Sequence, residues 1–220
     1  MSFAPQLSTL PSAQRALWAD LRQLPRHFVL YGGTALALRL GHRVSVDFDF
    51  FSSAPVEPAR LRAELPFLVD SEVLQLAPNT LSVVVNRAEP VKVSFFGGLT
   101  FGRVNEPEWT DDGVLQVASL LDVGACKMTV LPERAQAKDY LDVHALLQAG
   151  LTLPDLLGAA VAIHAGDFNP MIPLKALTYF ADGDLPSLPE VVRQALRDAA
   201  VAVKAIPELR RLPGGLTTVS

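Results

Sequence analysis

The segment from residue 28 to residue 51, FVLYGGTALALRLGHRVSVDFDFF, constrains the fold more than any other part of the sequence. Its first apolar run ends at two glycines, and Thr34 follows at a position where threonine can cap a helix. Alanines and leucines then favour a helix that ends at Gly41. Residues 44–51 alternate apolar and polar side chains with a period of two, which predicts a strand. The segment is therefore predicted to fold as strand, glycine turn, helix and strand.

Further strand patterns place most of the sheet in the N-terminal half. A first amphipathic helix is predicted at residues 12–24, ahead of the first strand. Glycines at 97 and 98 indicate a hairpin between two of the later strands. The later strands are predicted at residues 81–86, 91–96, 99–104 and 114–118.

The C-terminal half is helical in character. Ser119 and Asp122 form a capping pattern that opens a helix running to Met128, and Pro132 opens another that ends at Gly150. About three further helices follow, separated by prolines. We therefore predict an α+β fold with a mixed-sheet lobe and flanking helices at residues 1–118, followed by a helical lobe at residues 119–220.

Composition excludes several classes of protein. The net charge of −4 and the pI near 5.5 argue against a protein that coats nucleic acid through positive charge alone. Cys126 is the one cysteine, so no disulfide framework is possible and a reducing compartment is expected. No secretory leader and no run of about 18 apolar residues is present in the sequence. We expect a cytoplasmic protein without a membrane segment.

Asp47 and Asp49 point to metal chemistry, because alternation on a strand turns both carboxylates toward the same side. Two carboxylates that close repel each other unless a cation lies between them, and Mg²⁺ prefers carboxylate oxygens together with substrate phosphates. The glycine turn and the following helix N-terminus suit the triphosphate of an NTP. Arg39 and Arg43 could reach its outer phosphates, or both could be solvated surface charges.

The sequence resembles a known family at this motif. GGTALALRLGHRVSVDFDFF resembles the GG[ST]…D-x-D signature of DNA polymerase β-like nucleotidyltransferases, and in particular the AbiEii/AbiGii abortive-infection toxins. The likeness extends through LLDVGACKMTVLPERAQAKDYLDVHALL, which is similar to the helical segment of that family. It covers most of residues 28–150.

The resemblance implies a set of site residues, a reaction and partners. It implies Mg²⁺-dependent transfer of a nucleoside monophosphate from an NTP, such as ATP, to a hydroxyl or phosphate, with RNA or tRNA as a possible acceptor. It also implies a toxin paired with an antitoxin protein. In the family, a second cluster of lysine and aspartate side chains from the helical lobe completes a cleft between the two lobes. The implied residues are Gly32, Gly33 and Thr34 for phosphate, Asp47 and Asp49 for Mg²⁺, and Lys127, Lys138, Asp139 and Asp142 as the second cluster.

Helical spacing alone leaves the second cluster open to two interpretations. Lys138, Asp139 and Asp142 can share one edge of a helix, as a functional site or as a surface ion-pair ladder. Lys127 precedes Pro132 and cannot lie on the same helical stripe. It is either part of the site or a lysine that extends along the surface at a helix C-terminus.

One position departs from the pattern of many nucleotidyltransferases. These enzymes carry a third carboxylate on a neighbouring strand, and the corresponding position here is Ser94, a poor base. Asp139 or Asp142 could supply the missing oxygen, activation could be weaker, or only nucleotide binding could remain. Lys92 shares the face of Ser94 on this strand, which would place a cation beside the site.

Three functional hypotheses follow from these residues. The first is the Mg²⁺-dependent nucleotidyltransferase toxin, acting on RNA, tRNA or protein. The second is a catalytically silent nucleotide-binding or interaction module, which Ser94 motivates. The third is a nucleotidyltransferase that modifies a small molecule such as an antibiotic.

Overall fold

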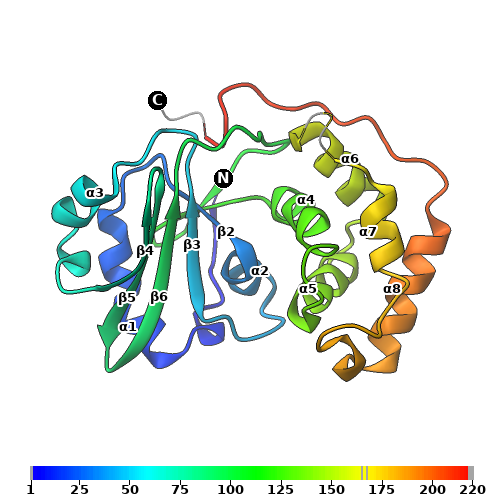
Figure 1. The fold of residues 1–220 in the computed structure, drawn as a ribbon, viewed down its shortest axis with the longest axis horizontal. Helices are drawn as coiled ribbons and strands as arrows, with labels where there is room; N and C mark the ends of the chain where they lie inside the picture. The colour runs from blue at the N-terminus through cyan, green and yellow to red at the C-terminus, as the bar shows by residue number, and fades with distance from the viewer. Residues whose placement is uncertain (1, 165, 167, 218–220) are drawn as a thin grey trace. The chain divides into compact units, whose positions relative to one another are not determined.

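A computed structural model of the chain describes residues 2–164, 166 and 168–217 (Figure 1). The chain divides into two compact units, which are described separately. The first unit contains Met1–Thr100, Glu106–Ser119 and Pro213–Ser220, and the second contains Phe101–Asn105 and Leu120–Leu212. The expected boundary after residue 118 lies next to one of the points where the chain passes between units.

The first unit is built on one mixed sheet with the strand order β1-β7-β8-β2-β3-β6-β5-β4. At its centre, β2 pairs antiparallel with β3 and parallel with β8, while β3 pairs parallel with β6. The mixed sheet of the predicted α+β fold is confirmed. The strands are β1 (Ser2–Phe3), β2 (Val29–Tyr31), β3 (Asp47–Phe51), β4 (Glu72–Ala77), β5 (Thr80–Arg87), β6 (Glu89–Phe96), β7 (Glu108–Thr110) and β8 (Gln116–Val117).

Helices cover both faces of this sheet, with α1 and α2 on opposite sides (Figure 1). Helix α1 contacts β5 and β6, and the aromatic side chains of Phe48, Phe50 and Phe95 fill the core with 0% exposure. Burial of such side chains is the main favourable contribution to folding. The helices of this unit are α1 (Ser12–Trp18), which continues as the 3₁₀ turn Ala19–Gln23, then α2 (Gly32–Leu40) and α3 (Pro58–Glu64), with further 3₁₀ turns at Leu7–Thr9 and Pro66–Leu68.

The predicted strand at 99–104 and its hairpin at Gly97-Gly98 are wrong. The backbone N–H groups of Gly98 and Leu99 donate to Ala54 and Ser52, which lie in the loop after β3. The N–H groups of Val104 and Asn105 donate to the Asp122 carboxylate instead of to a strand. The backbone groups of this segment are therefore satisfied outside the sheet, as buried backbone groups must be.

Two further differences from the prediction concern the start of β3 and the edge strand β4. The strand predicted at residues 44–51 begins only at Asp47, and Val44 and Val46 are exposed. Strand β4 was not predicted, because nearly all of its side chains are exposed and it carries no alternating pattern of burial. It joins β5 through a turn at Asn79, whose φ of 59° is one that asparagine tolerates.

The second unit is helical, as predicted. Its core contains Leu146, Leu156 and Ile163, and α4 packs against α6. The helix expected to open at Pro132 begins at Ala137, because residues 131–136 form turns closed by backbone bonds such as Gln136 N–H to Arg134 O. The helices are α4 (Leu120–Val130), α5 (Ala137–Gln148), α6 (Leu153–His164), α7 (Met171–Ala176) and α8 (Glu190–Ala202), with a 3₁₀ turn at Leu185–Ser187.

Within the described part of the chain, none of the helices taken singly has both the length and the apolar character required to cross a membrane. Helices α5 and α6 reach that length and composition only together, and the chain bends by 114° at the break between them.

Arg39 holds α2 to three strands of the first unit. Its Nε and Nη2 atoms donate to the carbonyl oxygens of Ala118 and Val117, both at 3.0 Å. Its Nη1 lies 2.6 Å from Glu108 Oε2, and its guanidinium carbon lies 4.1 Å from the centre of the Phe3 ring. With a side chain only 9% exposed, Arg39 has the environment of a structural residue.

We expect Arg39→Ala to destabilise the first unit. The substitution removes three hydrogen bonds and leaves Glu108 and two carbonyl groups without their donor, which costs about 2–4 kcal/mol of unfolding free energy. The measurement is the midpoint of urea unfolding followed by circular dichroism.

Arg60→Ala is the matched control for this prediction, because the Arg60–Glu64 pair has the same 2.6 Å separation but is mostly exposed. Its unfolding midpoint should change far less, since exposed pairs add little stability. Equal shifts for the two variants would contradict the structural role of Arg39.

Candidate functional site

Asp47 and Asp49 lie on one face of β3 and are both half-buried. Phe48 and Phe50 lie on the opposite face, where both are fully buried in the core. This is the alternation predicted from the sequence over these residues. The two aromatic side chains therefore fix the strand so that both carboxylates stay on the same side of the sheet.

The glycine turn at the start of α2 lies directly against one of these carboxylates. Tyr31, the last residue of β2, pairs with Asp49, and Gly32 follows with a φ of +73°. A Cβ atom built on Gly32 would lie 2.9 Å from Asp49 Oδ2, closer than real Cβ contacts come. Glycine is therefore required here both for its backbone conformation and for the space that the carboxylate occupies.

Thr34 has a different role from the predicted helix cap. Helix α2 begins at Gly32, Tyr31 occupies the N-cap position, and no side chain caps the helix. Thr34 is buried within the helix, where its Oγ1 donates to the Asp47 carbonyl oxygen and lies 2.8 Å from Ser45 Oγ. The hydroxyl thus ties α2 to the start of β3, next to the predicted metal ligands.

Arg43 lies beside the glycine turn, whereas Arg39 does not. A Cβ atom on Gly33 would collide with Arg43 Nη2 and would lie 3.3 Å from Ser45 Oγ. Arg43 Nη1 also donates to the Val44 carbonyl oxygen at 3.0 Å. Of the two arginines predicted to reach phosphate, the structure places only Arg43 near the N-terminus of α2, because Arg39 is bound to β7 and β8.

The strand next to the acid pair carries Ser94 and Lys92 on the same face. In the parallel ladder of β3 with β6, Ser94 pairs with Asp49 and Lys92 pairs with Asp47. Ser94 is 1% exposed and accepts a hydrogen bond of 3.1 Å from Ser82 Oγ. The position beside Asp49 on the neighbouring strand is thus held by a buried hydroxyl, in the register that the sequence suggested.

The second unit contains a buried cluster of charges between α4 and α5. Lys127 Nζ lies 2.7 Å from Asp139 Oδ1 and 2.7 Å from Asp142 Oδ2. Arg134 adds hydrogen bonds of 2.9 and 3.2 Å to the Asp139 carboxylate. Both aspartates are 0% exposed and Lys127 is 5% exposed, so two buried carboxylates are balanced by two cations.

Lys138 is not part of this cluster. It is exposed on α5, and within the described residues it forms no ion pair with Asp139 or Asp142. The interpretation of Lys127 as a lysine extending along the surface is also wrong, because the side chain is buried. Arg134 was not predicted as a site residue, although it lies in the quoted motif five residues before Asp139.

The acid pair suits Mg²⁺ better than it suits a metal ion whose ligands must all come from the protein. Across residues 2–164, 166 and 168–217, no three His, Cys, Asp or Glu side chains gather into a metal-binding group. Mg²⁺ is commonly bound through one or two carboxylates, with water and phosphates as the other ligands. Asp47 and Asp49 meet this description.

Cys126 and Tyr140 lack the chemistry of reactive groups. Burial raises the pKa of the Cys126 thiol to about 12, and Asp122 acts in the same direction, so the reactive thiolate is absent at neutral pH. Burial, together with Asp139 and Asp182, raises the pKa of Tyr140 to about 12. Cys126 therefore does not act as a thiolate nucleophile at neutral pH.

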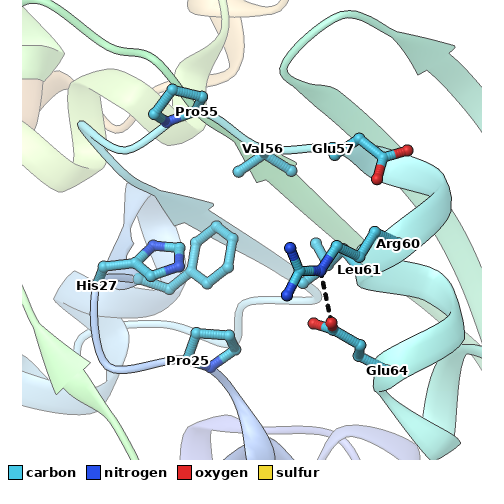
Figure 2. A pocket seen from close by; sticks show the side chains of 9 residues that line it. Pro25, His27, Pro55, Val56, Glu57, Arg60, Leu61 and Glu64 are labelled. Carbon is cyan, nitrogen blue, oxygen red and sulfur yellow. Dashed lines mark hydrogen bonds and ion pairs between the residues drawn. The ribbon is translucent and has the colours of Figure 1, made fainter.

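A separate pocket of about 370 Å³ lies at the other end of β2 and β3 (Figure 2). His27, which precedes β2, and Arg60, which is bound to Glu64, lie on its opposite walls. His27 Nδ1 is 2.8 Å from the hydroxyl of Ser52, the residue after β3, and burial lowers the pKa of His27. The pocket contains neither Asp47, Asp49 nor the glycine turn, so it is distinct from the candidate site.

Comparison with protein families identifies the chain. Residues 15–214 match the model of the nucleotidyl transferase AbiEii toxin of type IV toxin–antitoxin systems. The chain belongs to the AbiEii family. It is therefore a nucleotidyltransferase from a family of toxins, which confirms the resemblance found in the sequence.

Other proteins similar to this AbiEii-family chain agree with the fold. An uncharacterized protein of Aquifex aeolicus (strain VF5) is 30% identical over 159 residues, which are 70% of this chain and 74% of that protein. MenT4, a nucleotidyltransferase toxin of Mycobacterium tuberculosis H37Rv, has a TM-score of 0.62 at 16% identity, covering 88% of this chain and 83% of that one. A candidate nucleotidyltransferase of H. pylori has a TM-score of 0.56 at 19% identity, covering 86% and 90%.

We expect Lys127→Met to destabilise the helical unit of this AbiEii-family protein. The substitution removes the ammonium group that Asp139 and Asp142 share, and loss of one partner of a buried ion pair costs about 3–5 kcal/mol. Adding Asp142→Asn to Lys127→Met should recover part of that loss, because it removes one of the two carboxylates. Urea unfolding measures both effects.

Lys138→Met is the control for this prediction, since it removes an exposed lysine from the same quoted motif. Its unfolding free energy should stay within about 0.5 kcal/mol of the wild-type value. A Lys127→Met protein as stable as Lys138→Met would show that the buried cluster does not stabilise the unit.

Proposed function

We propose that Asp47 and Asp49 bind the Mg²⁺ of an NTP, ATP among them, and that the enzyme transfers the nucleoside monophosphate to RNA, tRNA included. A hydroxyl or a terminal phosphate of the RNA receives it. The observation that carries the proposal is the close approach of the Asp49 carboxylate to Gly32, which puts one acid of the pair against the N-terminus of α2, while Asp47 lies on the same face of β3. A bound Mg²⁺ would offset the repulsion of the carboxylates and the charge of the phosphates.

The residues of the first unit supply the phosphate contacts in this proposal. Gly32 and Gly33 have no side chains, so a phosphate can approach the first N–H groups of α2. The guanidinium of Arg43 lies beside Gly33, where it can bind an outer phosphate. Thr34 holds this turn to β3 through its bond to the Asp47 carbonyl oxygen. Arg39 has no part in the proposal, because the strands already bind it.

We further propose that transfer proceeds without a third carboxylate on β6. Ser94 occupies that position and is a poor base. Asp139 and Asp142 are buried and paired with Lys127, so neither is a suitable replacement. The acceptor hydroxyl would then lose its proton to solvent, with the rate gained from positioning and electrostatics. In this proposal, the buried cluster of Lys127, Asp139 and Asp142 supports the activity indirectly, by stabilising the second unit.

The biological setting in this proposal follows from the toxin family. The chain acts in the cytoplasm, where its NTP and RNA substrates are found, and an antitoxin protein encoded with it limits its effect. The acidic net charge of −4 means that RNA binding depends on local cations rather than on the charge of the whole protein.

Asp47→Asn and Asp49→Asn test the proposal directly. Each should reduce transfer of label from α-labelled NTP to tRNA to the background rate, because each removes one of two anionic metal ligands while keeping the side-chain shape. Asp70→Asn, at an exposed position of the same unit, should keep wild-type activity. Full transfer by both site variants would reject the proposed metal site.

The second candidate function is a catalytically silent nucleotide-binding module, which Ser94 favours because this serine replaces the expected carboxylate. Calorimetry with NTP and Mg²⁺, run beside the label-transfer assay, distinguishes this module from the enzyme. Binding by the wild-type protein without any label transfer, across tRNA, RNA oligonucleotide and small-molecule acceptors, would support the module. Transfer that depends on Asp47 and Asp49 would exclude it.

A further inference from the structure

Lys92 and Asp47 are neighbours of opposite charge that do not pair with each other. They lie side by side in the β3–β6 ladder and on the same face of the sheet. Opposite charges at such positions usually attract, yet in the described part of the chain neither side chain forms an ion pair. Lys92 is exposed and Asp47 is half-buried. Both charges therefore remain available to a ligand.

Lys92 and the glycine turn flank the acid pair from different sides. The sheet order β2-β3-β6 puts β3, with its two aspartates, between the other two strands (Figure 1). The turn continues from β2, where Tyr31 pairs with Asp49. Lys92 belongs to β6 and pairs with Asp47. A triphosphate held on the α2 N-terminus thus lies toward β2, and the lysine extends from the far side of β3.

We propose that Lys92 binds a phosphate of the acceptor RNA next to the group that is modified. This inference rests on the proposed nucleotidyl transfer at Asp47 and Asp49. In the reaction, the acceptor oxygen forms a bond to the α-phosphorus, the bond from that phosphorus to the bridging oxygen of the β-phosphate breaks, and pyrophosphate leaves with the electron pair. For a hydroxyl acceptor, the proton passes to water.

The geometry of this displacement places the NTP on one side of the acid pair and the acceptor RNA on the other. Attacking and leaving oxygens lie roughly in line on opposite sides of the phosphorus. With the leaving pyrophosphate toward the glycine turn, the acceptor approaches from the side of β6. Arg43 lies on the glycine side and Arg39 is bound to strands, so of these three cations Lys92 is the one on the side from which the acceptor approaches.

Lys92→Met should weaken the use of RNA without affecting the use of NTP. Measured with in vitro-transcribed tRNA, the KM for RNA should rise about tenfold, while the KM for NTP should change less than twofold. The slope of log(1/KM) for RNA against log salt should become shallower by about 0.7–0.9, the effect of one lost phosphate contact. Lys92→Arg should restore most of the affinity, since the charge is kept.

Arg15→Met is the matched control, because it removes one exposed cation from α1 on the opposite side of the sheet. Its KM for RNA and its salt slope should remain those of the wild type. A Lys92→Met enzyme with an unchanged KM for RNA, or with a higher KM for NTP instead, would overturn the acceptor role.

The Asp47→Asn and Lys92→Met variants test the metal site and the role of Lys92 separately. If Asp47→Asn abolishes transfer but Lys92→Met matches Arg15→Met, the metal site stands and the role of Lys92 is rejected. If Asp47→Asn transfers label normally, the proposed function falls. If the wild type labels a small molecule or a protein but no RNA, RNA is rejected as the acceptor, and the proposed role of Lys92 is rejected with it.

Discussion

The close approach of the Asp49 carboxylate to Gly32 is the constraint on which the candidate site depends. It exists because β2 runs antiparallel to β3, so that the chain leaving Tyr31 turns directly in front of the strand that carries the acids. Any side chain at Gly32 would enter the space of the carboxylate, and its φ of +73° disfavours other residues. Phe48 and Phe50 hold the strand from the opposite face. The site is therefore supported by regular structure rather than by loops.

Spacing in the sequence does not separate the charged residues with a structural role from those beside the acid pair; their partners in the structure do. Arg39 and Lys127 are both inside the molecule and are bound by acids or carbonyl groups of their own unit. Such groups are costly to bury alone, so their partners are as important as they are. Arg43 and Lys92 lie around the acid pair: Arg43 is beside the glycine turn, where it also donates to the Val44 carbonyl oxygen, and Lys92 is on the neighbouring strand. The proposed mechanism uses the second pair for phosphate and the first for stability.

Local patterns in the sequence were sufficient to predict the centre of the fold. Strand, glycine turn, helix and D-x-D strand follow one another within residues 28–51, so propensity and alternation specify them. The pairing of Lys127 with Asp139 and Asp142 could not be derived from helical spacing, because it joins two helices across a turn. The role of Arg39 depends on Glu108, Val117 and Ala118, which are 69–79 residues away in the chain. The strand wrongly predicted at 99–104 shows the same limit, since its hydrogen-bond partners lie in a loop and in α4.

A crystal structure with Mn²⁺ and a non-hydrolysable NTP tests the central claim most directly. Anomalous scattering would locate the ion without assumptions about the ligands. The account predicts a peak within coordination distance of both Asp47 and Asp49, with the triphosphate on the N-terminus of α2 at Gly32 and Gly33. A metal and nucleotide bound elsewhere, with these two carboxylates left without an ion, would contradict it.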